Sequence, residues 1–179
     1  MTAPRAPRFL LHDSPVGDIL IVTDGGGIIA LHPVHGAPDA DLHAIEALTG
    51  AAPVFDDGDP TACAAAEQID EYFSGDRRSF DLPLDWSRVR GFTGEALRAV
   101  CDIPYGETAG YGEVAIAAGS PRAARAVGTA CATTPFSIVV PVHRVVRADG
   151  SLGEYGGHSE VKQHLIDFER RVAAEGVAE

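Results

Sequence analysis

Cysteine is scarce and poorly spaced for chemistry that needs thiols in pairs. The chain has 179 residues and three cysteines, Cys63, Cys101 and Cys131, which are far apart and show no Cys-x-x-Cys spacing. A disulfide framework and a thiolate zinc site are therefore not expected. The histidines have no thiols beside them, so we predict no metal site. No phosphate loop or Rossmann fingerprint is present, and we predict no cofactor.

Long apolar runs are also missing. Charge-free stretches are broken by polar residues or proline, as in Thr129–Val142. A membrane-spanning helix needs about 20 apolar residues. We therefore predict a cytoplasmic protein with no membrane partner. With 45% hydrophobic and 22% charged residues, the composition is that of an ordinary globular chain and excludes a disordered acidic tail.

Basic residues are outnumbered, with 14 Lys plus Arg against 26 Asp plus Glu and a net charge of −12. This balance argues against a protein that coats nucleic acid through bulk charge. The acidity is uneven, because residues 1–90 hold 15 acids and 6 bases whereas residues 91–179 hold 11 acids and 8 bases. No acid lies between Glu113 and Asp149. The second half is thus the one better suited to a polyanion.

The first half predicts a small sheet followed by two helices. Three short β-branched and Leu-rich runs separated by turn signals predict a three-stranded antiparallel meander: Arg8–His12, Asp18–Asp24 and Ile28–His32. A helix is expected over Pro38–Leu48. A second helix should open at Asp59-Pro60, a cap residue followed by proline at the first helical position, and should stop at Gly75.

The second half predicts mainly helices. The expected helices are Thr93–Cys101, Tyr111–Ala118, one that opens at Ser120-Pro121, and a last one capped by Ser159. The two middle helices, joined at Gly119, give a helix-turn-helix signature. The later of these two has small residues around Arg125, so its backbone can approach another surface closely. The apolar run Ser137–Val146 has the character of a strand.

The second half resembles the O6-alkylguanine-DNA alkyltransferases. Six separated segments carry the resemblance, in order and with matching gaps: Phe92-Thr93, Pro104–Glu107 with Tyr111, Gly119–Gly128, Pro141–Val146, Gly153–Gly157 and Phe168-Glu169. The first half agrees with the family only in layout. The resemblance implies an α/β (α+β) fold with two domains: a ribonuclease-H-like domain over 1–90, and a winged helix-turn-helix-type DNA-binding domain over 91–179.

The resemblance also implies how DNA is bound. Members of this family bind duplex DNA in the minor groove and flip the alkylated guanine out of the stack. Arg125 matches the arginine that fills the vacated stack, and Tyr111 matches the tyrosine that helps to turn the nucleotide. The DNA-binding residues implied in this way are Tyr111, Arg122, Ala124, Arg125, Ala126 and Gly128. The base pocket implied is Cys131, Thr134, Val142, Val145, Gly153, Tyr155, Gly156 and Gly157.

The chain departs from the family where the chemistry takes place. The family transfers the alkyl group to a Cys between Pro and His, and its thiolate is prepared through a water by residues that match His143 and Glu169. Position 142 is Val, which can neither give nor accept a proton. Thr134 is a second departure, because the family usually has Asn there. Ordinary alkyl transfer is therefore predicted to be absent.

Two functions remain open. The first is a monomeric sensor that recognises flipped O6-alkylguanine in double-stranded DNA without repairing it, similar to alkyltransferase-like proteins, and flags the lesion for excision-repair proteins. Val142 would give the alkyl group an apolar wall. The second is an enzyme that uses Cys131 as a displaced acceptor, although a small buried structural residue is the simpler interpretation of that cysteine. A pocket reused for a small alkylated metabolite has no positive residue evidence.

Overall fold

The computed structural model describes residues 6–153 and 155–176, and the chain divides between Asp85 and Trp86 into two compact units. The predicted domain boundary, between residues 90 and 91, lies slightly further along the chain. The difference arises because a 3₁₀ turn, η1 (Trp86–Arg88), already belongs to the second unit. Each unit is described below by itself.

The first unit contains a four-stranded sheet in the order β3-β2-β1-β4. Its strands are β1 (Arg8–His12), β2 (Ile19–Thr23), β3 (Ile28–Pro33) and β4 (Val54–Phe55). The antiparallel meander of the first three strands is confirmed, with Leu10 opposite Ile21 and Ile21 opposite Leu31. The expectation of only three strands is wrong, because β4 pairs in parallel with β1. At two residues, β4 is too short to show an alternating pattern.

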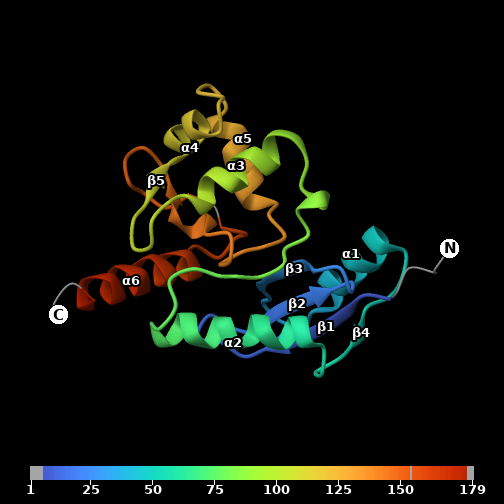
Figure 1. The fold of residues 1–179 in the computed structure, drawn as a ribbon. Helices are drawn as coiled ribbons and strands as arrows, with labels where there is room; N and C mark the ends of the chain where they lie inside the picture. Colours follow the sequence, from blue (N-terminus) through green and yellow to red (C-terminus); the bar gives the residue numbers. More distant parts are fainter. Residues whose placement is uncertain (1–5, 154, 177–179) are drawn as a thin grey trace. The chain divides into compact units, whose positions relative to one another are not determined.

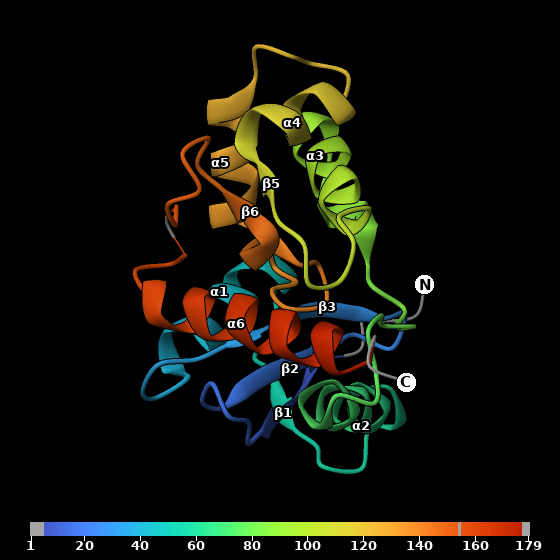
Figure 2. The same cartoon turned by 90° about the vertical axis from the view of Figure 1, so that its left-hand side faces the viewer.

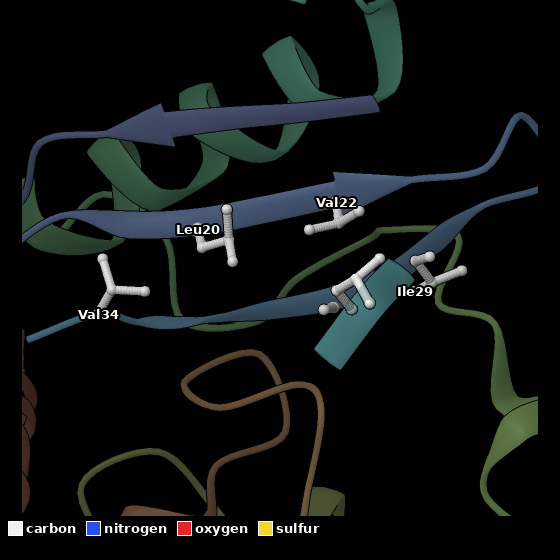
Figure 3. Close-up of a cluster of buried hydrophobic side chains, with 6 residues drawn as sticks. Leu20, Val22, Ile29 and Val34 are labelled. Carbon is white, nitrogen blue, oxygen red and sulfur yellow. The ribbon is translucent and has the colours of Figure 1, made fainter. Parts of the chain in front are cut away.

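The core of this unit lies on the central strands. All five residues of β2 are buried. Leu20 and Val22 point to the same side as Ile29 and Val34, as Figure 3 shows, and helix α1 (Asp39–Thr49) adds Ile45 to this cluster. Since successive side chains point to opposite faces of a sheet, the strand residues of this cluster share one face of the meander, and α1 covers that face. Ile19 and Ile21, on the opposite face, are also buried.

Helix α2 (Pro60–Ser74) begins and ends as its sequence predicts. The carboxylate of Asp59 accepts a hydrogen bond from the backbone N–H of Ala62 at 3.0 Å, and Gly75 stops the helix in the left-handed conformation. The buried face carries Ala62, Ala65, Ile69 and Tyr72. These positions recur at helical spacing, so the aromatic residue packs in the core.

The second unit is built from helices. They are α3 (Gly91–Cys101), α4 (Tyr111–Ala117), α5 (Ala124–Ala132) and α6 (Ser159–Glu175). Helices α3, α4 and α5 pack against one another, and Figure 2 shows α4 and α5 beside a short parallel ladder. The ladder pairs β5 (Ala109–Gly110) with β6 (Val145–Val146). A 3₁₀ turn, η2 (Val142–Arg144), leads into β6 and contacts α6. Figure 1 shows α3, α4 and α5 gathered together in this unit.

Three local expectations for this unit are wrong. Helix α5 does not open at Ser120, because the Ser120 carbonyl accepts a hydrogen bond from Ala123 N–H and closes a separate turn before the helix. Arg122 consequently precedes the helix. Helix α6 follows His158 and has no side-chain cap, so Ser159 is its first residue. The run 137–146 forms turns, η2 and a two-residue strand, since Val140 and Val142 bond locally.

Within the described ranges, no helix combines the length and the apolar character that crossing a membrane requires.

We expect Leu20→Ala to lower the free energy of unfolding by about 2–5 kcal/mol, because the substitution leaves a cavity in the buried cluster around β2. Leu48→Ala is the matched control: Leu48 is 58% exposed and its truncation should change stability by less than about 0.5 kcal/mol. Urea denaturation of both variants measures the difference. Equal losses would contradict this placement of the core.

Candidate functional site: a buried carboxylate clamp beside an open groove

A buried polar cluster joins η2 to α6. His143 is 0% exposed, Arg144 7% and Glu169 1%. His143 and Arg144 lie in η2, directly after the buried Val142, while Glu169 lies on the inner face of α6. Buried charged groups are tolerated only when they are paired. The partners within this cluster therefore decide whether this part of the unit is stable.

Glu169 receives hydrogen bonds from three sides. Its Oε1 lies 2.8 Å from His143 Nε2, and Arg144 donates to both carboxylate oxygens at 2.8 and 2.9 Å. The backbone N–H of Gly106 donates to Oε2 at 3.1 Å. Arg144 also donates to the carbonyl of Ile103 at 2.7 Å. The carboxylate thus ties α6 to η2 and to the chain that precedes β5. We call this cluster the carboxylate clamp.

The clamp fixes the charge states of its members. Burial by itself would raise the pKa of Glu169, but hydrogen bonds and charge from His143 and Arg144 outweigh burial and lower the pKa to about 2. Burial lowers the pKa of His143, although Glu169 opposes that change. Arg144 already neutralises the carboxylate, so the stable arrangement is an anionic Glu169 with a neutral His143.

A neutral His143 must donate through Nε2, because the carboxylate can only accept. Its Nδ1 then carries the free lone pair, and this buried atom has no hydrogen-bond partner among the described residues. Such a nitrogen is a proton acceptor. Its chain neighbour, Val142, is 2% exposed and has no proton to give. The clamp thus leaves one basic nitrogen free, and the residue before it in the chain has an alkyl side chain that cannot act as a nucleophile.

An open groove of about 510 Å³ lies on the α4–α5 side of this unit. It is lined by Tyr111, Ala124, Arg125, Gly128, Thr129, Ala132, Arg147 and Gly153. Five of these residues are among those implied by the family resemblance, from both the DNA-binding and the base-pocket sets. The structure brings them to one surface from α4, α5 and the loop after β6. The small residues of α5 form part of this lining, as the sequence suggests.

Tyr111 and Gly153 fix the shape of the groove. A Cβ atom placed on Gly153 would overlap the Tyr111 hydroxyl, so no other residue fits there without moving the ring. A Cβ on Gly128 would meet the same ring at an ordinary 3.8 Å. The requirement for glycine at 153 is therefore steric, and the tyrosine ring is held against the loop.

The other implied residues lie elsewhere. Tyr155 and Gly157 line a second cavity of about 190 Å³, which shares Arg147 and Gly153 with the groove. The remaining residues do not line either space: Cys131, Val142 and Val145 are buried, Thr134 is half-buried, and Arg122, Ala126 and Gly156 are exposed. Their roles in binding stay predictions.

Sequence reasoning missed two residues of this site, Lys162 and Arg147. Lys162 is only 1% exposed, and its ammonium lies 5.8 Å from the centre of the Tyr111 ring. A signal existed: Lys162, Ile166 and Glu169 are spaced i, i+4, i+7 on α6 and therefore share one face. All three are buried.

Comparison with known proteins places both halves of the chain in one family. Residues 8–86 match the ribonuclease-like domain of 6-O-methylguanine DNA methyltransferase, and residues 91–171 match its DNA-binding domain. A methylated-DNA–protein-cysteine methyltransferase of Mycobacterium bovis is 36% identical over 159 residues, which is 88% of this chain and 89% of that protein. The chain belongs to the 6-O-methylguanine DNA methyltransferase family. The predicted family and fold class are thus confirmed.

Further members of the methyltransferase family agree. A relative from Mycolicibacterium paratuberculosis is 50% identical over 115 residues, 63% of this chain and 68% of that protein. The crystal structure of Mycobacterium tuberculosis O6-methylguanine methyltransferase has a TM-score of 0.75 and 35% identity, over 92% of this chain and 93% of that one. The Mycobacterium tuberculosis protein in complex with DNA also has a TM-score of 0.75, with 34% identity over 93% of this chain and 94% of that one.

We expect Glu169→Gln to lose stability in a pH-dependent way. The folded state lowers the pKa of Glu169 from 4.5 to about 2, so its stabilisation is present above about pH 4.5 and is lost as the pH falls toward 2. At neutral pH the loss should be on the order of 3 kcal/mol.

Denaturation at several pH values measures this effect, with Asp167→Asn on the exposed side of α6 as the control. The difference in the free energy of unfolding between wild type and Glu169→Gln should become smaller below pH 4.5. The Asp167→Asn control should differ little from wild type at every pH. A gap that does not change with pH would mean that Glu169 is not ionised in the clamp.

Proposed function

We propose that this chain binds duplex DNA through α4 and α5 along the groove, accommodates a flipped O6-alkylguanine in the implied base pocket that includes Val142, Gly153 and Tyr155, and does not accept the alkyl group. It would act as a sensor that marks the lesion for other repair proteins, including those of excision repair. The observation that carries this proposal is Val142, an alkyl side chain beside an otherwise complete carboxylate clamp. Family membership supports DNA as the partner.

The surface formed by α4 and α5 suits the minor groove. That groove is only about 6 Å wide, so a helix can enter its edge only where its side chains are small. Ala124 and Gly128 line the groove of this protein from α5, and Arg125 is exposed between them. We infer that the two helices act as a helix-turn-helix and that Arg125 fills the space left by the flipped base.

Alkyl transfer needs a thiolate, and the described part of the chain does not favour one near the groove. Burial raises the pKa of the Cys131 thiol to about 11, and the nearby Lys162 offsets this only in part. At neutral pH this thiol is protonated and a weak nucleophile. Cys101, at the end of α3, does not line the groove, and Cys63 belongs to the first unit. Cys131 remains the acceptor in the rival enzymatic function.

We expect the protein to bind a duplex with O6-methylguanine more tightly than the same duplex with guanine, by about fourfold or more, because each buried methyl or methylene contributes about 0.8 kcal/mol. Fluorescence anisotropy measures both affinities. Arg125→Gln should weaken binding to both duplexes, whereas Arg171→Gln on α6 serves as a charge-matched control. Equal affinity for the two wild-type complexes would sink the sensor function.

Intact-mass spectrometry of the recovered protein separates the sensor from the enzyme. The sensor keeps its original mass after incubation with O6-methylguanine DNA. A gain of one methyl group mapped to Cys131 would instead establish the displaced acceptor.

We further expect Val142→Cys to acquire alkyl transfer. The new thiol would lie between Pro141 and His143 in the chain. Among the described residues, the buried Nδ1 of His143 has no hydrogen-bond partner, so its lone pair can take up the thiol proton. Mass spectrometry should show one added methyl group at residue 142 after incubation with methylated DNA.

Val142→Ser is the matched control, because a hydroxyl with a much higher pKa should gain no methyl group. The double variant Val142→Cys/Glu169→Gln should react more slowly. A Val142→Cys protein that binds methylated DNA but stays unmodified would contradict this interpretation of the clamp.

A further inference from the structure

The open edge of the sheet in the first unit carries exposed apolar side chains. In the described part of the chain only four large apolar side chains are exposed, and three of them are Leu48, Val54 and Phe55, at 58%, 56% and 56%. Val54 and Phe55 form β4, the last strand at one edge of the sheet, and Leu48 lies in the last turn of α1, shortly before β4. We call these three residues the apolar edge. Apolar side chains that are exposed together, rather than singly, indicate an interaction surface.

The apolar edge offers side chains on both sides of the sheet. The rings of Phe55 and Phe9 meet edge to face, with their centres 5.7 Å apart, and Phe9 packs against the core cluster that includes Ile45 of α1. Leu48 follows Ile45 by one helical turn, so Leu48 and Phe55 both belong to the side of the sheet that α1 covers. Val54 points to the opposite side, because successive side chains of a strand alternate. A partner at this edge would therefore meet apolar groups on both sides of the sheet.

The backbone of β4 can pair on its outer side. The N–H groups of Val54 and Asp56 donate to the carbonyls of residues 7 and 9 at 2.9 and 3.0 Å, so these groups face β1. Since backbone groups alternate in direction along a strand, the N–H and C=O of Phe55 face away from β1. No further strand follows β4 in the sheet of the described chain. Such an edge can accept an extended segment as an additional strand.

The charge around the apolar edge favours a basic partner. Between Arg8 and Arg77 the sequence contains 13 acids and neither lysine nor arginine. Asp57, two residues after Phe55, is exposed, and so is Glu46 shortly before the edge. A surface of one sign attracts a partner of the opposite sign and repels one of its own sign. A second copy of this chain would bring a second acidic first unit, and the phosphates of DNA would be repelled as well.

We propose that the apolar edge docks an extended segment of a partner protein in which two apolar residues are flanked by lysines or arginines. The segment would pair with the outward backbone groups of Phe55. One apolar side chain would cover Phe55 and Leu48, and the next would cover Val54 on the other side of the sheet. The basic residues would lie against the acidic surroundings, beginning with Asp57. The inference goes beyond the proposed function, because the first unit contributes none of the implied DNA-binding residues.

The probe is a fluorescein-labelled peptide with blocked ends and the sequence Lys-Lys-Val-Val-Lys-Lys, which is titrated with the full chain and followed by fluorescence anisotropy. Three altered peptides should each bind about tenfold or more weakly, because charge, apolar contact and backbone pairing all contribute. The first has glutamate in place of lysine, the second has serine in place of valine, and the third has N-methylated valines. Binding of the original peptide should also weaken when NaCl is raised from about 50 to about 500 mM.

Variants of the chain locate the contact. Phe55→Ser and Leu48→Ser should each weaken binding of the original peptide by about fivefold or more, because each removes an apolar contact. Ile116→Ser is the matched control and should leave peptide binding unchanged. Ile116 is the fourth exposed apolar side chain, at 63%, and lies on α4 in the second unit. Leu48→Ser keeps the test decisive even if Phe55→Ser does not fold.

Each outcome supports or overturns the docking site. Weaker binding in Leu48→Ser and Phe55→Ser, but not in Ile116→Ser, supports it. Unchanged binding in the first two variants would mean attraction by charge alone and overturns it, as does a wild type that binds none of the peptides. Equal binding of the glutamate or the N-methylated peptide removes the basic partner or the strand pairing. Self-association of the wild type in sedimentation that Phe55→Ser abolishes would assign the edge to a second copy of the chain and also overturns the proposal.

Discussion

The second unit depends on one buried carboxylate. Glu169 receives hydrogen bonds from an imidazole, a guanidinium and a backbone N–H, which belong to η2 and to the chain before β5. Removing one member of such a cluster would leave a charge buried without its counterpart, which costs more than an exposed ion pair contributes. The position of η2, and with it that of Val142, follows from this carboxylate. The groove residues Arg147 and Gly153 follow η2 along the chain.

The hydrogen bonds that hold η2 in place do not involve the side chain of residue 142. In a functional alkyl acceptor the base and the nucleophile must both be present, but only the base belongs to the carboxylate clamp. Under the proposed function, an alkyl side chain in place of a nucleophile at position 142 would therefore leave the surrounding structure intact. The side chain of Val142 is packed at 2% exposure and breaks no hydrogen bond of the clamp. Under the proposed function, the side chain at position 142 would change the reaction and leave the fold as it is.

Patterns confined to a short stretch of sequence predicted much of the fold. The three antiparallel strands and the Asp59 cap follow from alternation and from a cap residue followed by proline. The same cap rule failed at Ser120, because a serine before proline is equally suited to a turn, and there a backbone bond from Ala123 closes one. Strand β4 was missed because two residues show no period.

The residues of the candidate site were likewise only partly predictable from short sequence patterns. The contact between His143 and Glu169 spans 26 positions, and no spacing rule links them, so only the family resemblance paired them in advance. Lys162 was overlooked because a single charge next to apolar helix positions is normally exposed.

Lys162 is the only lysine of the chain, and its burial has a practical consequence. Reagents that acylate primary amines should not reach this side chain in the native protein. Acylation of Lys162 therefore reports the opening of α6 away from α4 and α5. A single chemical label on Lys162, read by mass, would follow the local unfolding of the second unit without interference from other lysines.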